Sequence, residues 1–265
     1  MIREPAAKFT TQAVVLRRYA LGEADRLVVM LTKDFGMVRA VAKGLRRSQK
    51  RFGGQVDLLN HLQVELSRRK KAELWVLESA KLVHAFYPLS EKVMTFAAGC
   101  HLAEVAGAFA TEAHADPGAF TALIAALDAL SRDFDPAPVG RVLELHVLRA
   151  AGLTPSLETC LLTGRRLADD ETAVFSPRHG GTIALTHDTG REALLLSPAS
   201  RRLMILALTL DLESALALPW TAEALAEARQ ALAAMIVYYT GRPLRARGFA
   251  EEAARFTKKF QGAPV

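Results

Sequence analysis

Short runs of alternating apolar and polar residues fill the first third of the chain. They lie at 11–19, 25–32, 37–43, 61–69 and 73–83, and residues that suit a pleated, half-buried surface are frequent in them. Turn signals at Leu21-Gly22 and at 33–36 separate the first three runs. Because five short antiparallel strands usually close into a small barrel, we predict a five-stranded OB-fold, with an SH3-like barrel as the alternative.

From Leu89 onward, apolar residues recur at every third or fourth position, which is the spacing of one helix face. Proline stands near the start of several of these runs, as expected at the first turn of a helix. Thr221 and Gly241 have the residue types typical of an N-cap and a C-terminal stop. The predicted helices lie at 89–113, 117–132, 136–152, 197–212 and 221–241.

Residues 154–196 interrupt the helical pattern with prolines, glycines and three strand-like runs, at 172–176, 181–186 and 192–196. This composition indicates a small β insert. We therefore predict an α+β chain of two domains, an OB-fold domain at 1–85 and a helical domain at 86–265 that carries the insert.

Positive charge is concentrated in the predicted barrel. The formal net charge is +6, and residues 1–85 hold 17 Lys and Arg against 8 Asp and Glu, while the remainder is mildly acidic. A basic module joined to an acidic one suggests that the first binds a polyanion and the second supplies scaffold or protein contacts. The alternative is chance variation of charge between domains.

The apolar runs and the cysteine content also indicate the cellular compartment. The longest largely apolar run, Leu203–Leu210, is far shorter than the ~20 residues that span a bilayer, and the first residues lack the apolar stretch of a secretory signal. Cys100 and Cys160 are the only cysteines, so neither a disulfide framework nor a four-thiolate metal site can form. We expect a cytoplasmic protein without membrane contact.

The segment VAKGLRRSQKRFGG, Val41–Gly54, links the third and fourth predicted strands and contains no acid. Arg and Lys bind phosphate oxygens, and glycine permits close backbone approach, so we predict a nucleic-acid contact rather than a solvated loop. A second basic turn follows at 68–71, which allows the two segments to converge on one groove. The predicted DNA-binding residues of these segments are Lys43, Arg46, Arg47, Lys50, Arg51, Arg68, Arg69, Lys70 and Lys71.

Aromatic rings on which bases stack are few in the predicted strands and the loops between them: Tyr19, Phe35, Phe52 and Trp75. Backbone contacts should therefore dominate the affinity, which should depend strongly on salt. We expect Lys50, Arg51 and Phe52 to form a mobile tip that orders on DNA.

Signatures of catalysis are absent, including phosphate loops, nucleophile elbows and paired metal-ligand motifs. His101 and Glu104 share a helix face. An enzyme with a site formed by these two residues and His146 is the hypothesis that we rank last. The insert has the outline of a zinc ribbon, but its four ligand positions hold Cys160, Thr163, Ala184 and His187. A structural zinc needs four good ligands, so we predict no metal and no cofactor.

Three features of AVVLRRYALGEADRLVVMLTKDFGMVRAVAKGLRR, Ala13–Arg47, resemble the opening of the bacterial RecO family: G-E-x-D, T-x-x-x-G and V-A-K-G-x-R. RVLELHVLRAAGLTPSLETC, Arg141–Cys160, is similar to that family's helix leading into its zinc-ribbon insert. The resemblance implies an OB-fold followed by a helical domain. By position, Lys43 and Arg46 match the basic motif, and Arg17, Arg39 and Arg47 lie beside it.

The resemblance also implies a non-enzymatic recombination mediator in DNA repair, associated with the nucleoid. Such a protein binds single- and double-stranded DNA, anneals complementary strands and, with RecR, helps load RecA onto DNA covered by single-stranded-DNA-binding protein. Arg141 lies in the region that the family uses to hold the C-terminal tail of that protein. The alternative function is a protein-interaction adaptor whose basic barrel binds an acidic peptide instead of nucleic acid.

Overall fold

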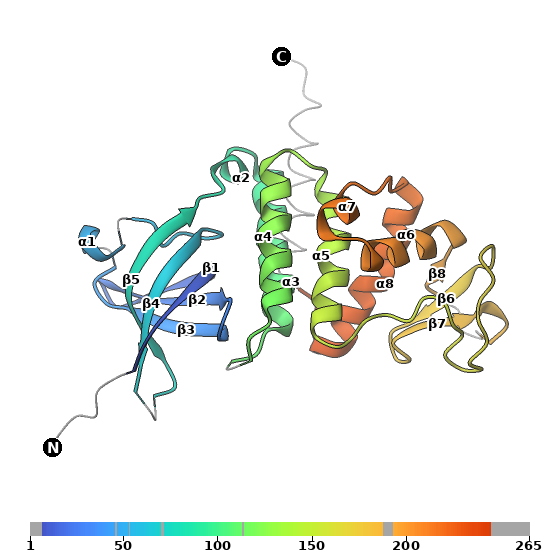
Figure 1. Ribbon diagram of the computed structural model, residues 1–265, viewed down its shortest axis with the longest axis horizontal. Coiled ribbons are helices and arrows are strands. Elements are labelled where there is room, and N and C mark those ends of the chain that lie inside the picture. Colours follow the sequence, from blue (N-terminus) through green and yellow to red (C-terminus); the bar gives the residue numbers. More distant parts are fainter. Residues whose placement is uncertain are drawn as a thin grey trace, which may run out of the picture.

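A computed structural model describes residues 7–45, 47–52, 54–69, 72–112, 114–187 and 193–244, without the side chains of residues 49 and 50. A barrel of strands lies at one end of the molecule, helices fill the middle, and a small sheet lies at the other end (Figure 1). None of the described helices combines the length and apolar character that a membrane span requires.

The barrel is closed in the order β1-β2-β3-β5-β4, which confirms the predicted OB-fold. Its first strand is long because its two halves have different partners: the first half pairs with β4, and the second half pairs with β2. A short parallel pairing of β3 with β5 closes the ring. The strands are β1 (Ala7–Leu21), β2 (Asp25–Thr32), β3 (Gly36–Ala42), β4 (His61–Arg68) and β5 (Trp75–His84).

A single helical turn, α1 (Gln49–Phe52), lies between β3 and β4 and closes one end of the barrel. Phe52 is fully buried and belongs to the same apolar cluster as Val56 and Leu62. Burial of a phenyl ring is worth ~1.5–3 kcal/mol, which holds this turn in place. The prediction that Phe52 lies on a mobile tip is therefore wrong.

The helical part is organised around α5, which is buried continuously from Val139 to Leu148. A helix that is buried on all sides must be surrounded by other helices, and α3, α4, α6, α7 and α8 all contact it. The helices are α2 (Tyr87–Glu91), α3 (Val93–Phe109), α4 (Pro117–Ser131), α5 (Pro136–Ala150), α6 (Pro198–Thr209), α7 (Leu212–Leu216) and α8 (Ala222–Thr240).

The predicted helix at 89–113 is divided in two, and the predicted helix at 197–212 ends early, at Thr209, as α6. Lys92 adopts an extended backbone and separates α2 from α3. Leu210 adopts an extended backbone and ends α6, and the Asp211 side chain then accepts the backbone N–H of Ser214 and caps the separate helix α7. The predicted cap at Thr221 and the left-handed Gly241 at the end of α8 are confirmed.

The insert forms a sheet in the order β7-β6-β8, from β6 (Ala173–Ser176), β7 (Gly181–Ala184) and β8 (Leu195–Leu196), with a 3₁₀ turn η1 (Leu185–His187). Cys160, Val174 and Ile183 share its small core. Arg201 of α6 is buried and donates to the backbone carbonyls of Leu157, Ala168 and Glu171, so it fixes the insert to the helices.

The β2–β3 turn joins the barrel to the loop between α3 and α4. The backbone N–H of Met37 donates to the carbonyl of Thr111 at 3.1 Å. Gly36 has φ +64°, and a Cβ there would lie 2.2 Å from the carbonyl oxygen of His114 and 2.3 Å from that of Thr111. This junction therefore requires glycine for both its backbone angle and its space.

We expect Gly36→Ala to lower the free energy of unfolding by ~1–3 kcal/mol more than Gly22→Ala does, because only the first adds an overpacked contact. Gly22 is the matched control, since it has φ +69° but nothing within 4 Å of its Cβ position. Urea unfolding of both variants measures the difference. Equal losses would show that the junction does not depend on the close approach.

Candidate nucleic-acid interface and peptide pocket

The first basic segment leaves β3 at the end of the barrel that α1 covers. Gly44, at φ +65°, turns the chain, and its backbone N–H donates to the Asp25 carboxylate at 2.7 Å. Lys43 and Arg47 are exposed on this turn. The Arg47 side chain is 76% exposed, and its guanidinium lies 3.9 Å from the Glu23 carboxylate. An exposed pair at this distance is weak, so Arg47 can exchange it for another anion.

Arg51 stabilises this turn through hydrogen bonds of its guanidinium. Its Nη2 donates to the Lys43 carbonyl at 2.6 Å, and its Nε donates to Ser48 Oγ at 3.2 Å. The guanidinium lies 5.0 Å from the centre of the buried Phe52 ring. Arg51 thus fixes the backbone that presents Lys43. Arg46 and the side chain of Lys50, predicted in the same segment, lie outside the described residues.

Arg17 and Arg39 hold the barrel to the helices. Arg17 Nη2 lies 3.5 Å from the Oε1 of Glu104, whose side chain is only 9% exposed. Arg39 Nε lies 3.2 Å from Glu112 Oε1 in a more exposed pair. Separating Arg17 from a nearly buried carboxylate costs more than separating a surface pair. Both remain predicted DNA contacts, but each is engaged with an acid of the helical part.

The second basic turn lies at the other end of the barrel. β3 and β5 run parallel, with Val41 paired to Val76. The basic segment follows the end of β3, whereas the second basic turn precedes the start of β5. The two segments therefore extend from this strand pair in opposite directions. Arg68, at the end of β4, donates to the Ala72 carbonyl, and Arg69 is exposed. Lys70 and Lys71 lie outside the described residues. The structure therefore separates the two basic segments instead of bringing them into one groove.

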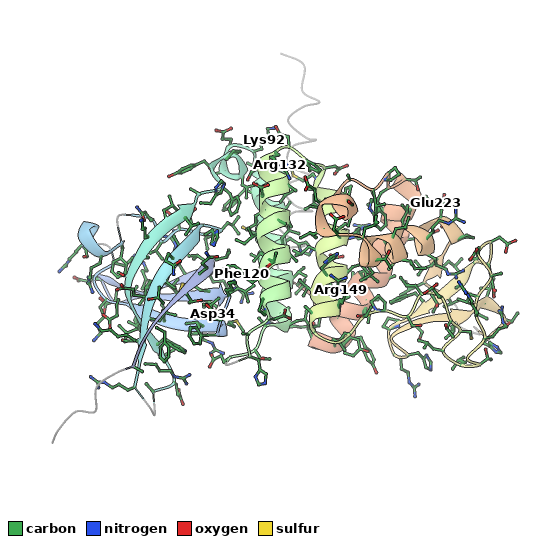
Figure 2. All side chains as sticks on the ribbon, viewed as in Figure 1. Asp34, Lys92, Phe120, Arg132, Arg149 and Glu223 are labelled. Carbon is green, nitrogen blue, oxygen red and sulfur yellow. The ribbon has the colours of Figure 1, made fainter. Side chains whose placement is uncertain are left out.

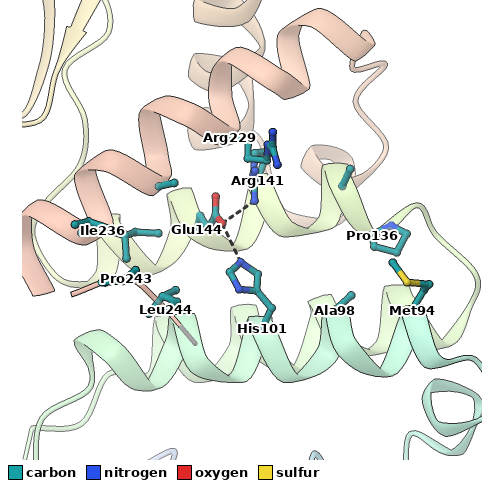
Figure 3. A pocket seen from close by; sticks show the side chains of 13 residues that line it. Met94, Ala98, His101, Pro136, Arg141, Glu144, Arg229, Ile236, Pro243 and Leu244 are labelled. Atoms are coloured by element: carbon teal, nitrogen blue, oxygen red, sulfur yellow. Dashed lines mark hydrogen bonds and ion pairs between the residues drawn. The ribbon is translucent and has the colours of Figure 1, made fainter. Parts of the chain in front are cut away.

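A cavity of about 380 Å³ lies between α3, α5 and α8 (Figure 3). Its walls are mainly apolar, and four polar side chains enter it from the three helices. Those four are His101, Arg141, Glu144 and Arg229, and the apolar lining includes Met94, Ala98, Pro136, Ala233, Ile236, Val237 and Leu244.

Three of these polar side chains form one buried network. Arg141 Nη2 donates to Glu144 Oε1 at 2.6 Å, and His101 Nε2 lies 3.3 Å from the same oxygen, as the dashed lines in Figure 3 show. Arg141 Nε, Glu144 Oε2 and His101 Nδ1 are buried and have no hydrogen-bond partner among the described residues. Such atoms are costly unless another polar group reaches them.

Arg229 differs from Arg141 in exposure. It is exposed on α8, and its side chain has no ion pair within the described ranges. The charge of Arg141 is already balanced by Glu144, whereas that of Arg229 is not. Sequence reasoning missed Arg229 and Glu144, although the i, i+3 spacing of Arg141 and Glu144 was a usable signal.

The enzyme hypothesis required His101, Glu104 and His146 to share a site, but each faces a different partner. His101 contacts Glu144, Glu104 contacts Arg17, and His146 Nε2 contacts the Ala207 carbonyl at 2.9 Å. The structure therefore does not assemble these three side chains.

The insert keeps the geometry of two facing turns around Cys160. The Ala184 backbone N–H donates to Cys160 Sγ at 3.2 Å. Burial raises the pKa of this thiol, but hydrogen bonds from the Thr163 hydroxyl and from the backbone at 162, 163 and 184 outweigh it and lower the pKa to about 7. Thr163 and Ala184 supply no zinc ligand, and His187 is exposed. These residues do not fit a structural zinc ion.

Comparison with known proteins covers nearly the whole chain. The family profile described as Recombination protein O N terminal matches residues 7–86, and Recombination protein O C terminal matches residues 91–248. Relatives named DNA repair protein RecO include one from Anaeromyxobacter dehalogenans (strain 2CP-1), 34% identical over 93% of this chain and 96% of its own length. Another comes from Symbiobacterium thermophilum and is 30% identical over 92% of this chain and 96% of its own length. A third, from Nocardioides sp. (strain JS614), is 31% identical over 92% of this chain and 99% of its own length.

Proposed function

Because this chain belongs to the RecO family of DNA repair proteins, we propose that it is a non-enzymatic recombination mediator. It binds single- and double-stranded DNA, anneals complementary strands and, with RecR, helps load RecA onto DNA covered by single-stranded-DNA-binding protein. The DNA-binding unit is residues 1–85, and residues 86–265, with the insert at 154–196, dock partner proteins. The protein acts at the nucleoid in the cytoplasm.

The observation that supports DNA binding most is the exposed turn after β3. Lys43 and Arg47 project from a closed barrel, and Arg51 and Asp25 fix the backbone between them. Cations held on a fixed backbone lose little freedom when they contact phosphate, so they bind a polyanion efficiently.

Annealing of two complementary strands, with and without single-stranded-DNA-binding protein, tests the function as a whole. The protein should accelerate annealing without a nucleotide and should remain active on coated strands. Filter binding of single-stranded oligonucleotides near physiological salt separates the mediator from the adaptor. Failure to retain oligonucleotides would favour the adaptor, and a strict ATP requirement for annealing would contradict the mediator.

The pocket between α3, α5 and α8 is the docking site that we propose for the acidic tail of single-stranded-DNA-binding protein. Its apolar walls suit an apolar side chain of the tail, and its exposed cation suits a carboxylate. Arg229 meets the tail carboxylate, while Arg141, paired with Glu144, supports the floor and offers its remaining N–H.

We expect Arg229→Ala to weaken binding of the tail peptide by ~10-fold, since hydrogen bonds to charged groups are worth ~1.5–3 kcal/mol. Fluorescence anisotropy of a labelled peptide measures the effect. Arg202→Ala is the matched control, because Arg202 is an exposed arginine of α6 that does not line the pocket. Equal losses in both variants would show a general charge effect and would argue against this pocket.

A further inference from the structure

Three aromatic rings gather at the barrel end opposite α1. The ring centres of Phe9 and Phe35 are 5.2 Å apart, those of Phe9 and Trp75 are 5.6 Å apart, and those of Phe35 and Trp75 are 5.4 Å apart. Phe52 closes the α1 end with one buried ring, whereas Phe9 and Phe35 at this end are only partly covered and Trp75 lies buried beneath them. We call them the ring cluster.

The strand register explains this arrangement. Residues of β1 before Ala13 pair with β4 alone, so the start of β1 extends past β2. Phe9 has the same parity as Ala13 and Val15 and so lies on the inner face of the extension. Phe35 comes from the β2–β3 turn, whose neighbouring residue Asp34 is labelled in Figure 2. Rings from three places in the chain thereby meet at the open end.

Exposure distinguishes the rings. Trp75 is 7% exposed and forms the floor, Phe9 is 36% exposed, and Phe35 is partly buried. The cluster therefore presents ring surface to solvent instead of sealing the barrel completely. The Phe9 ring meets Trp75 edge to face, with 70° between the ring planes, and its exposed part offers an aromatic surface of the kind on which a base stacks.

The rim of the ring cluster is basic. The Arg68 guanidinium lies 5.3 Å from the Trp75 ring centre and is held there by its hydrogen bond to the Ala72 carbonyl. Arg69 and Lys33 are exposed on the two adjoining turns. Of the nearby acids, Asp34 accepts a hydrogen bond from the Thr11 hydroxyl at 2.6 Å, and Glu73 is exposed on the turn before Trp75, so the described cations of the rim outnumber the acids by one. Positive charge around aromatic surface complements the phosphates and bases of a single strand.

We propose that the ring cluster is a base-stacking site for single-stranded DNA, with Phe9 as the stacking ring and Arg69 and Lys33 as backbone contacts. This inference rests on the proposed DNA-binding function and adds a site separate from the basic turn after β3. Bases in a duplex are already stacked on one another, so the cluster should act on single strands only. A protein that binds both forms would thus hold unpaired bases at one barrel end.

Phe9→Leu tests the site, because leucine keeps an apolar side chain over Trp75 but removes the flat ring. We expect it to weaken binding of a single-stranded oligothymidylate by ~5- to 10-fold while duplex affinity changes less than ~2-fold. Phe9→Tyr should bind like the wild type, because it keeps the ring. Tyr238→Leu, which removes a half-exposed ring from α8, should also bind like the wild type.

A spectroscopic readout supports the same test. In a Trp220→Phe background Trp75 is the remaining tryptophan, and the single strand should quench its emission while the duplex should not. Equal losses of single-strand and duplex affinity in Phe9→Leu, or unchanged single-strand affinity, would overturn the inference. If the wild type binds no DNA, the proposed function fails too; binding unaffected by Phe9→Leu overturns only the ring cluster.

Discussion

Arg141→Met should lower the free energy of unfolding by ~3–5 kcal/mol, the cost of removing one partner from a buried ion pair. Glu144 is 3% exposed, and Arg141 Nη2 donates to it at 2.6 Å. Methionine fills a similar volume but leaves the carboxylate without its cation. The measurement is urea unfolding followed by circular dichroism.

The double variant Arg141→Met, Glu144→Leu is the control that isolates the pair. It removes both charges, so most of the lost stability should return, because apolar residues of similar volume often replace a buried ion pair at little cost. A single variant that unfolds within ~0.5 kcal/mol of the wild type would show that Arg141 and Glu144 are not paired in the folded protein.

Replacing Arg46, Arg47, Lys50 and Arg51 with alanine should weaken single-stranded DNA binding by ~10²- to 10³-fold at ~0.1 M salt. Each phosphate contact to a single strand contributes ~0.7 to the slope of log K against log salt. Four contacts therefore change log K by almost ~3 between ~1 M and ~0.1 M salt. Arg51→Ala also releases the backbone beneath Lys43. Filter binding at fixed salt measures the loss.

A charge-matched control separates contact from net charge. Alanine at four exposed arginines of the helical part and the insert removes the same charge without touching the barrel, and we expect a loss below ~5-fold because distant exposed charges are screened. Those four are Arg132, Arg166, Arg178 and Arg202. Equal losses in both quadruple variants would place the DNA elsewhere.

The barrel could be predicted from the sequence because alternation within strands is a local signal. β3 shows this directly: Val38, Ala40 and Ala42 are buried, while Arg39 between them is exposed. The same argument failed for Phe52. A four-residue helix has no readable period, and the charge around Phe52 concealed that its ring closes the barrel.

Partners across the chain could not be predicted from spacing. Glu104 pairs with Arg17 of the barrel, and Arg229 reaches the pocket of Arg141 from α8, far along the sequence. Such contacts depend on how helices pack, which no local pattern encodes. The contact of Phe9 with Trp75 could not be predicted for a related reason, because only the register of β1 against β4 places Phe9 beside Trp75.

The central claim is that the basic turn after β3 binds DNA phosphates. The salt dependence of single-stranded DNA binding tests this claim most directly. The slope of log K against log salt should be less steep by ~2 to 3 in the quadruple variant at residues 46, 47, 50 and 51 than in the wild type. The charge-matched control should keep the wild-type slope. An unchanged slope in the basic-turn variant would contradict the account.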